Sequence, residues 1–140
     1  YLKEMFVGIK GVGSYLNGKA IHVNQNALPS SLVVVGTSPY AKEKADITFH
    51  NMKKIFVNSR DIRRSGSATL DLCYVACGRF DAFYEASLAP WDYSAAATII
   101  KESGGIIEAI EPDVWGYEKS IGIIAGNQHN YLSLLNLLKE

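Results

Sequence analysis

No apolar run in this sequence is long enough to cross a membrane, and neither sign of charge is in excess. The longest apolar runs, such as 32–35, have the length of a strand, whereas a membrane-spanning helix needs roughly 20 apolar residues. Lysine plus arginine number 14, and aspartate plus glutamate also number 14, so there is no basic field that would attract nucleic acid. We therefore expect a soluble protein with no nucleic-acid partner and no membrane partner.

Cysteine is scarce, and the chain has neither an initiator methionine nor a signal peptide. Cys73 and Cys77 lie four residues apart, which places them on one face of a helix. No second cysteine pair or nearby histidine completes a zinc site, so two reduced core thiols in a cytoplasmic protein are expected. Because the sequence opens at Tyr1 with neither of these features, we interpret the chain as cut from a longer protein.

The sequence does contain enough apolar residues for one core, and its strand and helix patterns alternate regularly. It has 140 residues, of which 48% are hydrophobic. A β-hairpin that turns at Asn17-Gly18 is predicted within 1–27, and an α/β domain is predicted over 28–140. The expected sheet is mostly parallel or mixed, layered between helices on both faces. The domain's strands are predicted at 31–36, 55–57, 80–85, 106–109 and 121–125, and its helices at 41–54, 65–77, 93–103 and 131–139.

The sequence contains no complete match to three well-known catalytic or nucleotide-binding motifs. Residues 13–20 nearly match the phosphate-binding pattern G-x-x-x-x-G-K-[ST], but Ala20 lacks the hydroxyl that binds magnesium. The Gly11-Val12-Gly13 segment lacks the third glycine of a dinucleotide-binding turn. A G-x-S-x-G motif is absent around 65–67, and the three histidines lie in dissimilar surroundings. The sequence therefore gives no support to nucleotide binding or to serine-hydrolase chemistry.

Two predicted helix starts and two carboxylates remain as the candidate site. Residues 65–68 open a helix whose first N–H groups are able to face a ligand oxygen, and Gly66 permits close approach to the backbone. Glu85 ends a predicted strand, and a short loop leads from it to Asp92 at the start of the next helix. In open α/β sheets, ligands bind beyond the carboxyl ends of strands. From spacing alone, helix capping by Asp92 is favoured over metal binding, since one carboxylate rarely holds a hard cation.

Segments 66–85, 90–96 and 102–105 carry a specific combination of motifs. Trp91-Asp92 begins a W-D-x-[SA]-A-[AG] pattern, and 102–105 completes it with E-[AS]-G-G. The opening segment 11–19 has the layout of the hairpin that precedes these motifs. Together they resemble the carboxyl-terminal half of the inositol monophosphatase family, over essentially all 140 residues.

The resemblance implies roles for five residues. Asp92 matches the family aspartate that binds catalytic Mg²⁺ and lies close to the substrate, while it also sits at a helix start. Glu85 matches a residue that contacts a substrate hydroxyl, and Gly66, Ser67 and Ala68 match residues that line the substrate pocket. The intact protein is therefore expected to hydrolyse small phosphate monoesters, such as inositol phosphate or a sugar phosphate, and to form a homodimer.

The family's other magnesium ligands have no match in this chain. They come from an upstream glutamate and a D-P-[IL]-D-G-T segment, and none of the six aspartates here (Asp46, Asp61, Asp71, Asp81, Asp92, Asp113) has that setting. We therefore expect a fragment that is inactive alone, with its hairpin belonging to the missing amino-terminal domain. Two alternatives stay open: a noncatalytic α/β ligand-binding module that has lost the metal site, and an interaction domain that pairs with another subunit.

Overall fold

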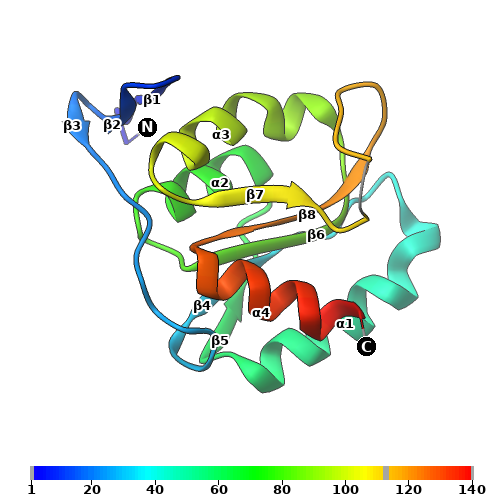
Figure 1. Ribbon diagram of the computed structural model, residues 1–140. Helices are drawn as coiled ribbons and strands as arrows, with labels where there is room; N and C mark the ends of the chain where they lie inside the picture. The colour runs from blue at the N-terminus through cyan, green and yellow to red at the C-terminus, as the bar shows by residue number, and fades with distance from the viewer. Residues whose placement is uncertain (1, 112–113, 140) are drawn as a thin grey trace.

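The computed structural model describes residues 2–111 and 114–139, and a small antiparallel sheet opens the chain (Figure 1). Asp113, one of the six aspartates considered above, and the first residue of the predicted hairpin segment lie outside the described residues. Asn17 and Gly18 have φ angles of 49° and 78°, as a two-residue hairpin turn requires. The predicted hairpin is confirmed. Its strands are β1 (Phe6–Ile9), β2 (Gly13–Leu16) and β3 (Lys19–Ala20).

A five-stranded mixed sheet forms the centre of the molecule, in the order β5-β4-β6-β8-β7. Its strands are β4 (Leu32–Val35), β5 (Asp61–Arg63), β6 (Ala82–Leu88), β7 (Ile106–Ala109) and β8 (Ile121–Gly126). β4 pairs in parallel with β5 and β6, whereas β8 pairs antiparallel with β6 and β7. The sheet is therefore mixed, which is one of the two forms that the sequence predicted.

Helices cover both faces of this sheet, as predicted (Figure 1). α2 (Ala68–Ala76) and α3 (Pro90–Glu102) lie on one face, and α1 (Ala45–Asn58) and α4 (Gln128–Lys139) lie on the other. Side chains alternate along the strands, so Phe83 packs in the cluster beneath α2 and α3 while Tyr84 packs in the cluster beneath α1 and α4. Two short 3₁₀ turns, Leu28–Ser30 and Lys42–Lys44, complete the elements of the described chain. Within the described residues, no helix combines the length and the apolar character needed to cross a bilayer.

The strand predicted at 55–57 is wrong, because these residues form the last full turn of α1. Ile55 is fully buried and continues the inward face set by Thr48 and Asn51, at helical spacing. Phe56 and Val57 are 54% and 71% exposed, so the apolar run lies across two sides of a helix. A run of three apolar residues has no periodicity that separates strand from helix. The actual strand β5 was missed because Ile62 is its one apolar residue.

The amino-terminal hairpin packs on α3 and makes no strand pairing with the five-stranded sheet in the described part of the chain. Ser14 Oγ donates to the Ile99 carbonyl oxygen at 2.6 Å, and the Gly11 N–H donates to Glu102 Oε1 at 2.9 Å. Gly8 lies so close that a β-carbon there would come within 2.9 Å of the Ile99 backbone. The Phe6 ring also lies against the Tyr74 ring of α2, with 6.2 Å between their centroids. The hairpin therefore contacts two helices, and its assignment to a separate domain stays a prediction.

Candidate functional site

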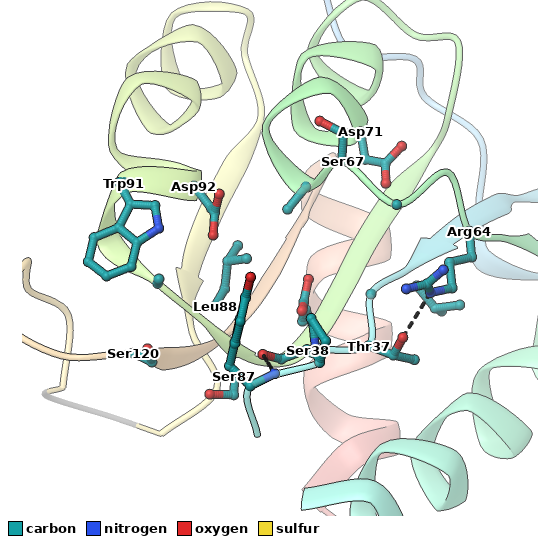
Figure 2. Close-up of a pocket in the computed structure, with 18 residues that line it drawn as sticks. Thr37, Ser38, Arg64, Ser67, Asp71, Ser87, Leu88, Trp91, Asp92 and Ser120 are labelled. Carbon is teal, nitrogen blue, oxygen red and sulfur yellow. Dashed lines mark hydrogen bonds between the residues drawn. The ribbon is translucent and has the colours of Figure 1, made fainter. Parts of the chain in front are cut away.

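A cavity of about 560 Å³ opens beyond the carboxyl ends of β4, β5 and β6 (Figure 2). Because these three strands run in the same direction, the loops that follow them meet at one edge of the sheet. α3 begins at this edge, and the strand β8 starts there because it runs antiparallel. All five residues predicted from the sequence line the cavity: Gly66, Ser67, Ala68, Glu85 and Asp92. Their individual roles stay predictions.

A bulge in β6 shapes the floor of the cavity. The register of β6 against β8 shifts between Glu85 and Leu88, whereas regular pairing would keep the register constant. Bulges re-aim side chains, and here Glu85, Ser87 and Leu88 all line the cavity although a regular strand alternates its side chains. The bulge therefore adds apolar and hydroxyl groups beside the carboxylate.

Glu85 lies in an environment that disfavours its charged form. The side chain is 6% exposed, and burial is the main cause that raises its pKa from 4.5 to about 7. The negative charges of Asp92 and Asp71 raise the pKa further, whereas the Arg64 guanidinium opposes the shift. Two neighbouring acidic groups thus repel the charge of Glu85, and a cation in the cavity would relieve this repulsion.

Asp92 lies in the first turn of α3 but does not cap it, so the capping role considered from the sequence is wrong. Ala89 occupies the N-cap position in an extended conformation, and Pro90 is the first helical residue. The helix therefore begins at Pro90, three residues before the start predicted at 93. Among the described residues, no hydrogen bond reaches the Asp92 carboxylate, while Thr69 Oγ1 donates to its backbone carbonyl at 2.8 Å. Its carboxylate is therefore free to bind a ligand.

The first turn of α2 forms a second wall. Gly66 has a φ of 94°, a conformation in which a side chain would be strained. Ser67 occupies the N-cap position, yet its side chain makes no capping hydrogen bond. Instead, the Ser67 N–H donates to Ser65 Oγ at 3.2 Å. The Ser67 hydroxyl and the start of α2 are thus available to a bound oxygen.

Several lining residues were missed from the sequence, and most follow directly after strands. Arg64 and Thr37, which follow β5 and β4, lie on the wall opposite Asp92, and Arg64 Nε donates to Thr37 Oγ1 at 2.8 Å (Figure 2). Asp71 lies one turn after Ser67, is 2% exposed, and its Oδ1 has no hydrogen-bond partner among the described residues. Burial raises the pKa of Asp71 above its usual range, while Ser65 and Arg64 counteract this. Residues 36–40 could have been found from the sequence, because they follow a predicted buried strand and ligands bind beyond the carboxyl ends of strands.

The donor set fits part of a magnesium site. Carboxylate oxygens are the ligands that Mg²⁺ prefers, and Asp92 offers such oxygens free of competing hydrogen bonds. In residues 2–111 and 114–139, no three acidic, histidine or cysteine side chains converge closely enough to enclose a metal ion. The described chain therefore supplies an incomplete set of ligands.

Three comparisons connect this geometry with known proteins. The model of the inositol monophosphatase family matches residues 1–140. The Nus factor SuhB of Xylella fastidiosa is 38% identical over 131 residues, which cover 89% of this chain and 47% of that protein. A fructose-1,6-bisphosphatase/inositol-1-monophosphatase of Aquifex aeolicus is 36% identical over 142 residues, which cover 100% of this chain and 52% of that protein.

A solved structure has the same fold. The inositol monophosphatase from Anabaena (Nostoc) sp. PCC 7120 superposes with a TM-score of 0.87 at 32% identity, covering 97% of this chain and 54% of that one. The chain thus spans about half the length of the curated relatives it matches.

Proposed function

Because the chain belongs to the inositol monophosphatase family, we propose that the full-length protein hydrolyses small phosphate monoesters with the help of Mg²⁺. Inositol phosphates and sugar phosphates are the proposed substrates. One observation carries the proposal: a single cavity gathers the free Asp92 carboxylate, the buried Glu85 carboxyl group and the start of α2. A polyol phosphate has both the charged group and the hydroxyls that such a cavity would bind.

Each wall of the cavity has a proposed part in the reaction. Bound Mg²⁺ would activate water and stabilise the negative charge on the leaving oxygen. Asp92 would hold the ion, and the nearby amino-terminus of α3 favours a negative charge at this place. Glu85 would bind a hydroxyl of the leaving group and so orient the ester, while Ser67 and the first N–H groups of α2 would face its oxygens.

The 140-residue chain by itself should bind Mg²⁺ weakly, with a Kd in the millimolar range or above. Few carboxylate oxygens are available to the ion, and sites with sparse oxygen ligands have affinities of about this order. Isothermal titration calorimetry of the chain with MgCl₂ measures the affinity, with the Asp92→Asn chain as the control for nonspecific binding. A micromolar Kd would contradict the proposal that the ligand set is incomplete.

Glu85→Gln in the full-length protein should raise KM for a polyol phosphate by about tenfold or more, while kcat changes much less. A hydrogen bond to a charged group contributes about 1.5–3 kcal/mol, and the amide that replaces it is a weaker acceptor. Steady-state phosphate release at saturating Mg²⁺ separates the two constants. A wild-type protein that binds the ester without releasing phosphate would instead support a noncatalytic binding module.

We further propose a cytoplasmic homodimer whose partners are small phosphorylated substrates. The two cysteines support a cytoplasmic location. Cys73 and Cys77 are both free, and burial raises the pKa of both thiols, so they are expected to stay reduced and unreactive. Exposed apolar side chains on α1, such as Phe49 and Phe56, provide surface for a second copy.

A further inference from the structure

Gly36, the residue directly after β4, lies against the side chain of Glu85 on the neighbouring strand. The Gly36 N–H donates to the Tyr84 carbonyl oxygen at 2.8 Å, which holds the ends of the two parallel strands together. A β-carbon built on Gly36 would overlap the Glu85 carboxyl group and would come within 2.9 Å of its Cγ. The Glu85 side chain therefore occupies the space that any side chain at position 36 would need.

Space, and not backbone conformation, requires glycine at this position. The glycines of positive φ in the described chain are 11, 13, 18, 66, 78 and 104, and Gly36 is not among them. An alanine would thus fit the backbone of residue 36 without strain. The clash with Glu85 is the reason for the missing side chain.

An added methyl group at position 36 would act on the carboxyl end of Glu85. The Glu85 backbone is fixed by strand pairing and the Gly36 backbone by its hydrogen bond to Tyr84, whereas the end of a glutamate side chain is able to rotate. Glu85 is 6% exposed, so a displaced carboxyl group has little room except toward the cavity and Asp92. Such a movement would change the place at which a ligand meets Glu85.

We infer that Gly36 is a positioning residue: its missing side chain allows the Glu85 carboxyl group to lie back against the strand end, where it meets a hydroxyl of the leaving group. The inference rests on the proposed function, because it needs a phosphate ester with a hydroxyl beside Glu85. The loop that begins at Gly36, after β4, would then help the site to select polyol esters over esters without hydroxyls.

Gly36→Ala in the full-length protein tests this through two substrates. KM for inositol 1-phosphate should rise about tenfold, as for a substrate that loses a hydrogen bond to a charged group. KM for phenyl phosphate, which has no hydroxyl to offer, should change less than twofold, and kcat for both esters should stay within a few fold. Equal effects on both esters would overturn the inference.

Gly105→Ala is the control, because it adds the same methyl group to another crowded place, which lies outside the cavity. Its β-carbon would come within 2.8 Å of Ile100 Cγ2 and 2.9 Å of Val23 Cγ1. This variant should lower the Tm and leave both KM values unchanged. A KM change of the same pattern in Gly105→Ala would assign the effect to general destabilisation and overturn the inference.

A double-mutant cycle tests the contact without any assay of activity. Glu85→Asp shortens the side chain by one methylene and frees the space that Gly36→Ala fills. The Tm loss of Gly36→Ala should therefore be mostly recovered in the double variant, whereas residues without contact give additive losses. Additive Tm changes would overturn the inference.

The two proposals fail in different ways. A wild-type protein that hydrolyses neither ester would overturn the proposed function, and with it the part of Gly36 in selecting the substrate. An active wild type in which Glu85→Gln raises KM but Gly36→Ala does not would overturn the inference on Gly36 alone.

Discussion

Asp92→Asn should lower phosphate release by the full-length protein about a hundredfold or more, while the Tm changes little. Even residues that only support a metal ligand typically cost 10- to 100-fold when they are replaced, so loss of the charged ligand itself should cost at least as much. Asparagine keeps the size and one oxygen of the side chain but removes the negative charge that Mg²⁺ prefers. Steady-state kinetics at increasing Mg²⁺ concentration, beside thermal unfolding, measure both effects.

The small effect on stability follows from the place of Asp92 in α3. The residue lies in the first turn and makes no capping hydrogen bond, so the favourable effect of its charge on stability is the interaction with the helix dipole, about 0.3–1 kcal/mol. Removing the charge also relieves its repulsion of Glu85, which offsets part of that loss.

Asp46→Asn provides the control for Asp92→Asn, since Asp46 occupies the first turn of α1 and does not line the cavity. It should leave turnover unchanged. A near-normal rate in Asp92→Asn at saturating Mg²⁺, together with a large loss of Tm, would refute the assignment of Asp92 as a metal ligand.

Glu85→Gln should make the protein more stable at pH 8, by on the order of 3 kcal/mol in the absence of Mg²⁺. The folded protein raises the pKa of Glu85 from 4.5 to about 7, so between these values the folded state binds more protons than the unfolded state. Wild-type stability should therefore fall as the pH rises from about 4.5 to 7, by at most about 1.4 kcal/mol per pH unit, and level off above it. Glutamine carries no charge at any pH, so the variant lacks this decline.

Urea unfolding of wild type and Glu85→Gln at several pH values measures the difference. Glu43→Gln is the matched control, because Glu43 is exposed and lies outside the cavity, and its curve should follow that of the wild type. Parallel curves for wild type and Glu85→Gln between pH 4.5 and 7 would show that Glu85 ionises normally in the folded protein. The expected gain illustrates a common trade-off, in which a binding site keeps a carboxylate at a cost in stability.

Local sequence patterns were sufficient for most of the elements and for the predicted site residues. The turn at Asn17-Gly18, the buried strand β4 and the helix that ends before Gly78 follow from turn chemistry and apolar spacing, which act between near neighbours. The W-D and E-x-G-G motifs identified the family that the comparison over residues 1–140 confirms. The resemblance over 66–85 and 90–96 selected the five residues that the fold brings to one cavity.

Other features depend on contacts between residues distant in the chain, and only the tertiary structure decided them. Ile55 belongs to a helix because its neighbours at helical spacing face the sheet, and three apolar letters do not encode that choice. The raised pKa of Glu85 follows from its burial and from the negative charges of Asp92 and Asp71, and only the fold brings these groups together. The need for glycine at position 36 also comes from the tertiary structure. The backbone there would accept a side chain, but the Glu85 carboxyl group fills the space. Glu85 comes 49 residues later in the chain and is brought next to Gly36 because β4 and β6 pair in parallel.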